Sequence, residues 1–327
     1  MNKIKVVVTD YIEPDLKWEE KELSKYPGID FSYYQLKYKS KEEILSVISD
    51  ADVIVVNMVP MDREILKRLK KCKLIIRHGI GYDNVDVSAC TEFGITLANI
   101  PDYCVEEVAE QAVMLIFACS RKIYYQKKVL VESAKKGEWD FSDLYPIFKL
   151  HGKTLGIVGC GRIGSTVLRM MRGMGMNVRV CDPYLTEERK KELNIVHEDL
   201  NTILKESDII TVHCLLNEET KEMFKYEQFK LMKPTAFFVN TARGGIVKTE
   251  DLIRAIEEKV ISGAGIDVYT GKEPPPINSP LFQFENIILS PHISWYSEEA
   301  GWTIRFKIVE DILRFYKGEK PRFIVNN

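Results

Sequence analysis

Apolar runs of strand length alternate along this chain with charged segments of helical period, and this alternation limits what the chain can fold into. Strands that alternate with helices pair in parallel, because each right-handed crossover returns the chain to the same edge of the sheet. A parallel sheet is covered by helices on both faces, so its strands are apolar on both sides. The sequence therefore predicts an α/β fold of doubly wound parallel sheets.

The candidate strands fall into two series, as expected for two domains in a chain of 327 residues. The first series is expected at Ile4–Thr9, Asp30–Tyr34, Val53–Val56 and Leu74–Ile76. The second is expected at Thr154–Val158, Asn177–Cys181, Asp208–Val212, Ala236–Asn240, Ile261–Ile266 and Ile287–Leu289. A capping box of Ser40 and Glu43 predicts a helix over 41–49.

Three further segments join or follow these series. A junction at Asn99–Pro101 leads into a helix predicted from Val105 to about Lys127. The next segment, Lys135–Leu150, is irregular and rich in aromatic residues. A last helix is expected at about Ser297–Tyr316, after the second sheet is complete, and is expected to cross back onto the first domain.

Composition excludes several classes of function. The formal net charge is -2, from 46 basic and 48 acidic residues, which gives no electrostatic footprint for nucleic acid or a membrane surface. No stretch approaches the roughly 20 apolar residues of a spanning helix, and the N-terminal apolar run is too short for a signal peptide, so a cytoplasmic location is expected. The seven cysteines match no zinc spacing, and no metal site is predicted. Most of them are expected to be buried free thiols.

The strongest local motif is Gly-Cys-Gly-Arg-Ile-Gly at Gly159–Gly164. It follows a candidate strand, opens a helix predicted at Ser165–Met174, and precedes Asp182 at the end of the next strand. This is the arrangement of a Rossmann dinucleotide site, in which the helix N-terminus faces the phosphates. The Asp182 carboxylate would bind ribose hydroxyls and repel a 2′-phosphate, which favours NAD over NADP. The alternative is a tight turn without a ligand.

Three charged side chains follow strands of the second series. They are Arg243, Glu273 in the loop beyond the fifth strand, and His292. The carboxyl ends of parallel strands meet at the edge where α/β proteins bind ligands. A guanidinium binds a carboxylate bidentately, and a carboxylate beside a histidine favours the protonated ring of a general acid. Each residue alone has an ordinary structural explanation, but the set at one edge indicates an oxidoreductase.

These motifs together resemble the D-isomer-specific 2-hydroxyacid dehydrogenases from about Leu74 to Ala300. The resemblance also includes Arg77–Asp86, Val108–Glu110, Asn240–Gly245, Ile266–Val268, Glu273–Pro274 and Pro291–His292. Within the family, Arg77 and Trp295–Ala300 look most like the branch of the C-terminal binding proteins and their bacterial dehydrogenase relatives. One position departs from the pattern, because Lys272 stands where the family usually has its catalytic Glu, and Glu273 follows one residue later.

The resemblance implies a formate/glycerate-dehydrogenase-like fold. A Rossmann NAD domain at 101–297 would be inserted into a split, flavodoxin-like substrate domain made of 1–100 and 298–327. A homodimer is also implied, with an interface formed by Val105–Lys127 and the aromatic segment Trp139–Phe148.

The resemblance further implies a role for each site residue. His292 would be the general acid and base, paired with Glu273, while Arg243 would hold the substrate carboxylate and carbonyl. Arg77 and the backbone at Ile80 and Gly81 would also bind the substrate carboxylate. Residues expected against NAD are Gly159, Gly161, Arg162, Ile163, Gly164, Asp182, His213, Cys214, Leu215, Thr241, Ala242, Trp295 and, at the nicotinamide carboxamide, Asp267.

The implied reaction is NAD-dependent hydride transfer between nicotinamide and a small 2-keto or D-2-hydroxy acid. Two alternatives remain open at this point. One is a phosphoglycerate dehydrogenase or glyoxylate/hydroxypyruvate reductase within the same enzyme class. The other is a non-catalytic, NAD-sensing binding protein like the C-terminal binding proteins.

Overall fold

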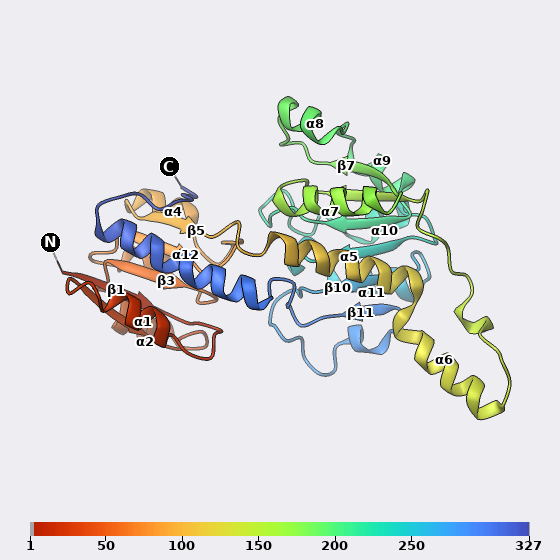
Figure 1. Cartoon of the computed structure of the whole chain (residues 1–327), viewed down its shortest axis with the longest axis horizontal. Coiled ribbons are helices and arrows are strands. Elements are labelled where there is room, and N and C mark those ends of the chain that lie inside the picture. The colour runs from red at the N-terminus through yellow and green to blue at the C-terminus, as the bar shows by residue number, and fades with distance from the viewer. Residues whose placement is uncertain (1–2, 327) are drawn as a thin grey trace. The chain divides into compact units, whose positions relative to one another are not determined.

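The computed structural model describes residues 3–326, and the chain forms two compact units (Figure 1). The first unit contains the residues up to Cys104 and those from Tyr296 onward, and the second contains Val105–Trp295. The second unit is therefore an insertion in the first. No helix within the described residues is long and apolar enough to cross a membrane.

The first unit is built on a five-stranded parallel sheet. Its strands are β1 (Ile4–Val8), β2 (Ile29–Tyr33), β3 (Val53–Val56), β4 (Leu74–Arg77) and β5 (Thr96–Asn99), in the order β2-β1-β3-β4-β5. This is the flavodoxin-like order, as predicted. All four residues of β3, the central strand, are buried because helices cover both faces of the sheet.

Within residues 3–326, five α-helices cover this sheet. They are α1 (Lys17–Leu23), α2 (Lys41–Ile48), α3 (Arg63–Lys67), α4 (Val87–Glu92) and α12 (Glu298–Tyr316). Helix α2 starts with the predicted capping box, in which Ser40 Oγ accepts from Glu43 N and the Glu43 carboxylate accepts from Ser40 N. Helix α12 is capped by Ser297 and packs on this sheet through Ile304, Ile308 and Ile312, so the last helix returns to the first unit.

Two features of this unit were not predicted from the sequence, strand β5 and its pairing with the C-terminal segment. Strand β5 follows a turn at Gly94, and its Ala98 forms an antiparallel bridge with Ile324. The Val325 amide also donates to the Leu97 carbonyl at 2.8 Å. The C-terminal segment thus pairs with the edge strand, and this pairing satisfies backbone groups that a bare edge would expose.

The second unit is built on a six-stranded parallel sheet. Its strands are β6 (Thr154–Val158), β7 (Asn177–Cys181), β8 (Ile209–Val212), β9 (Phe237–Asn240), β10 (Gly263–Ile266) and β11 (Ile287–Leu289). In the order β11-β10-β9-β8-β6-β7, strand β6 has β7 on one side and β8 on the other. The order in which strands are added to the sheet therefore changes direction at β6. Ligands of open α/β sheets bind at such a switch point.

Seven α-helices accompany this sheet. They are α5 (Val105–Arg121), α6 (Ile123–Lys136), α7 (Arg162–Gly173), α8 (Glu187–Leu193), α9 (Leu200–Glu206), α10 (Tyr226–Leu231) and α11 (Thr249–Glu257). Three of the four residues of β10 are Gly or Ala, and helix α5 lies close to one of them, Gly265. A Cβ on Gly265 would come within 3.0 Å of the Leu115 Cβ.

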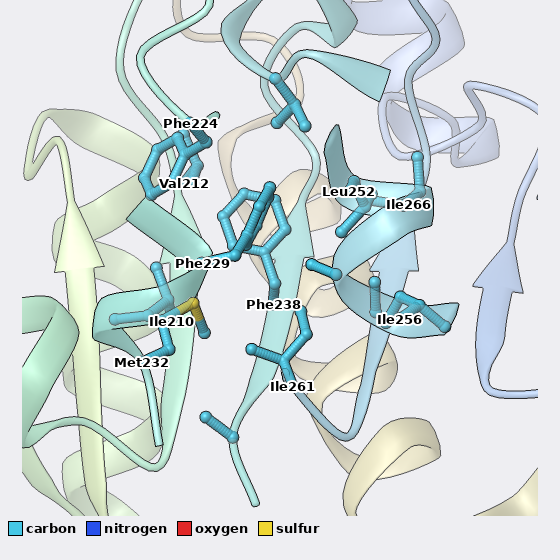
Figure 2. Packing of buried hydrophobic residues seen from close by; sticks show 14 of the residues in the cluster. Ile210, Val212, Phe224, Phe229, Met232, Phe238, Leu252, Ile256, Ile261 and Ile266 are labelled. Atoms are coloured by element: carbon cyan, nitrogen blue, oxygen red, sulfur yellow. The ribbon is translucent and has the colours of Figure 1, made fainter. Parts of the chain in front are cut away.

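The core on one face of this sheet is centred on three fully buried phenylalanines, Phe224, Phe229 and Phe238 (Figure 2). The Phe238 ring lies 4.8 Å from that of Phe224 and 5.3 Å from that of Phe229, between centroids. Each buried phenylalanine contributes about 1.5–3 kcal/mol of hydrophobic stabilisation. Because Ile210 and Val212 of β8, Phe238 of β9, and Ala264 and Ile266 of β10 pack in the same core, these three strands are held together.

The single helix predicted from Val105 to Lys127 is wrong. Helix α5 ends at Arg121, Lys122 adopts a left-handed backbone with φ 50°, and α6 continues from Ile123 in another direction (Figure 1). The apolar face of α5 is buried against the sheet, whereas Val129 and Ser133 are the buried residues of α6. The helical period runs through the break, so the sequence pattern does not reveal it.

Candidate active site

The glycine turn after β6 packs closely on its surroundings but is open at one position. Gly159 has φ 89°, and a Cβ there would lie 2.5 Å from Cys214 N. A Cβ on Gly164 would lie 2.1 Å from the Gly159 carbonyl oxygen, whereas nothing lies within 4 Å of a Cβ on Gly161. Helix α7 has Gly161 at its N-cap and no side-chain cap, so its first amides are available to an anion. The turn can therefore hold a pyrophosphate.

Asp182 stands beside this turn at the end of β7. Its Oδ2 accepts a hydrogen bond from Cys160 N at 2.8 Å, and its Oδ1 accepts one from Tyr184 N at 3.0 Å. A carboxylate has about four lone-pair sites, so each oxygen can still accept a ribose hydroxyl. The residues present thus fit a dinucleotide without a 2′-phosphate.

The loops after β8 and β9 carry two buried polar atoms without a protein partner in the described part of the chain: His213 Nδ1 and Thr241 Oγ1. Burial lowers the pKa of His213 to about 3, so its ring is neutral, and its Nε2 lies 3.0 Å from Thr211 Oγ1. A buried polar group without a partner is costly unless a ligand or water satisfies it. These atoms fit a bound cofactor, as do their neighbours Cys214, half-buried, and Leu215, exposed.

His292 follows β11, and the structure brings Glu273 against it. His292 Nδ1 lies 2.6 Å from Glu273 Oε2, while Glu273 Oε1 accepts from Tyr269 N at 2.9 Å. Gly271, two residues before Glu273, adopts a left-handed backbone with φ 80°. Burial opposes ionisation of Glu273, but the hydrogen bond and charge of His292, with the nearby Arg243 charge, hold its pKa below the usual range. The pairing leaves His292 Nε2 as the nitrogen that can exchange a proton with a ligand.

Asp267 anchors the segment that carries His292. Its buried carboxylate accepts from Ser290 Oγ at 2.5 Å, from the Ile293 and Ser294 amides at 3.1 Å each, and from Ser294 Oγ. Gln111 of α5 donates to Ser290 Oγ at 3.1 Å. This anchoring role of Asp267 was not predicted from the sequence. The signal that could have indicated it is an acid directly after a strand of mainly small residues.

Arg243 follows β9, one strand from the Glu273 loop. The Asn240 side chain closes its loop by donating to the Arg243 carbonyl and accepting from Ala242 N. The loop lies against the backbone of Tyr269, because a Cβ on Gly244 would meet the Tyr269 carbonyl carbon at 2.0 Å. The carboxyl ends of β9, β10 and β11 thus bring Arg243, Glu273 and His292 to one edge of the sheet.

The predicted substrate-binding residues Arg77, Ile80 and Gly81 lie at the carboxyl end of β4 in the first unit. Arg77 Nη1 donates to the His78 carbonyl at 2.7 Å, and Asn99 Nδ2 donates to the Ile80 carbonyl at 2.7 Å. Within residues 3–326, the Ile80 and Gly81 amides have no acceptor, although Gly81 is buried. Two adjacent free amides in a buried loop form an anion-binding concavity.

No group of His, Cys, Asp or Glu in the described residues could hold a metal ion. A glycine turn at a Rossmann switch point, together with an Arg, Glu and His set at the same sheet edge, defines a nicotinamide-dependent dehydrogenase. Comparison with known proteins specifies the class further. Residues 113–294 match the family model of the D-isomer specific 2-hydroxyacid dehydrogenase, NAD binding domain.

The chain is similar to curated and solved relatives over most of its length. It is 36% identical to a glyoxylate reductase of Korarchaeum cryptofilum, over 88% of this chain and 86% of that one. It is 38% identical to a D-3-phosphoglycerate dehydrogenase of Methanocaldococcus jannaschii, but spans only 54% of that protein. The structure of D-lactate dehydrogenase from Aquifex aeolicus with NAD and lactic acid superposes with a TM-score of 0.86 at 28% identity, over 98% and 99% of the two chains.

The chain belongs to the D-isomer-specific 2-hydroxyacid dehydrogenase family, and it is an NAD-dependent oxidoreductase. The expected fold class and cofactor are confirmed. These relatives are named as enzymes, so the alternative of a non-catalytic binding protein is not favoured.

The close contact at Gly164 gives a direct test of the cofactor site. We expect Gly164→Ala to cost about 1–3 kcal/mol of stability, the usual cost of overpacking, and to weaken NADH binding. Gly173→Ala in the same helix is the control, since its Cβ enters open space. Thermal unfolding and NADH fluorescence titration measure both effects. Equal behaviour of the two variants would contradict the packing argument.

Proposed function

We propose that this protein reduces a small 2-keto acid to a D-2-hydroxy acid with NADH, and catalyses the reverse reaction. The observation that carries the proposal is the His292–Glu273 pair at 2.6 Å, beside Arg243 and on the sheet that holds the glycine turn. Family membership supports hydroxy acid chemistry, and the pair supplies the proton donor that carbonyl reduction needs.

Each residue has one task in the proposed reaction. Bound NADH supplies the hydride that reaches the substrate's keto carbon. Arg243 binds the substrate carboxylate and polarises the adjacent carbonyl, because a guanidinium offers two parallel donors. His292 donates a proton from Nε2 to the carbonyl oxygen, and Glu273 keeps the ring oriented and stabilises its charged form. The free amides of Ile80 and Gly81, with Arg77, bind the carboxylate from the first unit.

The second unit takes the role of the NAD domain and the first that of the substrate domain. The glycine turn and Asp182 lie in the second unit, and the family model for NAD binding falls within it. In the second unit, residues predicted to contact NAD include Arg162 and Ile163 on the first turn of α7, and Trp295 next to the His292 segment. Asp267 was expected at the nicotinamide carboxamide, but its buried carboxylate already accepts four hydrogen bonds, so its proposed task is to position the His292 segment.

The substrate is proposed to be a short 2-keto acid such as glyoxylate or hydroxypyruvate. Relatives named glyoxylate reductase are matched over 86% of their length, against 54% for the phosphoglycerate dehydrogenase. The test is NADH oxidation, followed by absorbance, with glyoxylate, pyruvate, hydroxypyruvate, phosphohydroxypyruvate and branched 2-keto acids. We expect the fastest turnover with a two- or three-carbon acid, and much slower turnover with NADPH. Turnover of none of these acids would overturn the proposal.

His292→Gln tests the proton donor. We expect this variant to lose about 10²–10⁴-fold in kcat, the usual contribution of a general acid, while NADH binding is retained. Steady-state kinetics with the best keto acid and a fluorescence titration of NADH measure the two quantities. A His292→Gln enzyme with normal kcat would show that another group delivers the proton.

We also propose that the protein is a homodimer. Helix α6 and the segment after it form an arm that leaves a row of large apolar side chains exposed: Ile123, Leu130, Val131, Trp139, Phe141, Tyr145 and Phe148. A hollow of about 740 Å³ between this arm and the amino ends of β8 and β9 is lined in part by Tyr124, Tyr125 and Phe148. Exposed apolar area of this extent is typical of a protein interface, and a second copy of the arm is the proposed occupant.

A charge on the arm tests this assembly. We expect Leu130→Glu to shift the protein from dimer to monomer, because an ionised carboxylate is costly to bury in an apolar interface. Ile277→Glu is the matched control, since Ile277 is 93% exposed and lies outside the arm. Sedimentation velocity measures the oligomeric state. A wild type that sediments as a monomer would refute the proposal.

The location proposed for this enzyme is the cytoplasm. All seven cysteines are free, five of them buried, and no disulfide links any pair. Free thiols in this number suit a reducing compartment.

A further inference from the structure

A buried ion pair lies at the carboxyl edge of the first sheet and has no task in the proposed reaction. His78 Nε2 donates to Glu13 Oε1 at 2.8 Å, and the two side chains are only 6% and 9% exposed. Glu13 belongs to the loop after β1, whereas His78 is the first residue after β4. Because β3 lies between these strands, the pair bridges two loops across the end of β3.

His78 belongs to the loop that presents the free Ile80 and Gly81 amides. We call this loop (Arg77–Gly81) the carboxylate loop. Most of its other backbone groups are already bonded. The His78 amide donates to Val56 O at 2.8 Å, the Gly79 carbonyl accepts from Ile100 N at 3.0 Å, and the carbonyls of His78 and Ile80 accept from side chains. Fixing these groups leaves the Ile80 and Gly81 amides as the donors available to a ligand. The Glu13–His78 pair is a further side-chain tether of this loop, and it comes from the loop after β1.

The ionised state of Glu13 fits such a tether. Burial opposes its ionisation, but the charge and hydrogen bond of His78 lower its pKa to about 2. Other charged groups act nearby, since Arg305 of α12 feels the charges of Glu13, Glu19 and Asp15. Desolvating an ion pair often cancels its attraction, so a buried pair is weak evidence for stability alone and better evidence for fixed geometry.

We propose that Glu13 is a positioning residue for substrate binding, which acts through His78 to hold the carboxylate loop in its binding geometry. The inference rests on the proposed function, in which the Ile80 and Gly81 amides bind the substrate carboxylate. Glu13 itself touches neither substrate nor cofactor. Its loss therefore weakens binding of the carboxylate equally in the ground state and the transition state, which raises KM and leaves kcat unchanged.

The test compares Glu13→Gln with Glu19→Gln. Both changes remove the carboxylate of a buried ion pair in the same unit while keeping its size, since Glu19 pairs with Arg305 at 2.5 Å and joins α1 to α12. We expect Glu13→Gln to raise the KM for glyoxylate about tenfold, with kcat and NADH affinity within about twofold of wild type. His78→Gln should give the same split. Glu19→Gln should leave all three quantities near wild type.

A second readout does not depend on turnover. Calorimetry measures the affinity of the enzyme–NADH complex for oxamate, a carboxylate that cannot be reduced, and the same tenfold loss is expected in Glu13→Gln. The tether is refuted if Glu13→Gln changes neither KM nor oxamate affinity relative to Glu19→Gln, or if kcat and NADH affinity fall along with them. If the wild type binds oxamate but reduces no keto acid, the proposed reaction is refuted. The tether is then decided by the oxamate affinity of Glu13→Gln relative to Glu19→Gln. A wild type that does not bind oxamate would refute both.

Discussion

The buried Asp267 carboxylate is the interaction on which the geometry of the active site depends. Its four hydrogen bonds come from the segment Ser290–Ser294, in the middle of which His292 adopts φ 54°. A left-handed backbone at a non-glycine residue costs about 1–3 kcal/mol and persists only where its surroundings impose it. Hydrogen bonds to a charged group, at about 1.5–3 kcal/mol each, are strong enough to impose it. His292 is therefore presented to Glu273 by a loop that cannot relax without leaving a buried charge unsatisfied.

Carboxylates that accept hydrogen bonds from backbone amides also fix loops at the carboxyl edges of both sheets. In the first unit, buried Asp10 accepts from the amides of Asn57 and Met58, and so fixes the loop after β3. In the second, Asp182 accepts from Cys160 N and ties β7 to the glycine turn. Parallel strands leave their carboxyl ends without ladder partners, and an ionised carboxylate satisfies several amides of a neighbouring loop at once. Acids at strand ends thus fix loops that follow neighbouring strands.

The sequence predicted what short-range patterns encode. Apolar runs located ten of the eleven strands, and glycine spacing with a following acid located the dinucleotide turn. Strand β5 was missed because Thr96–Asn99 is short and partly polar, and its burial depends on the distant C-terminal segment. The break at Lys122 was missed because backbone conformation at one residue leaves the helical period unchanged. The anchoring by Asp267 and the Glu13–His78 pair depend on contacts between residues far apart in the chain, which no local pattern records.

At the edge of the second sheet, the charge on the pair of His292 and Glu273 depends on the proton of His292. When His292 carries its proton, its charge offsets that of Glu273 at 2.6 Å, and the Arg243 charge acts on the same carboxylate. Loss of that proton leaves the negative charge of Glu273 without its counterpart, which favours the return of a proton to the ring. Gly271 lies two residues before Glu273, and its left-handed backbone with φ 80° is part of the loop that brings Glu273 to His292. The electrostatics of catalysis thus depend on a backbone conformation that glycine adopts without strain.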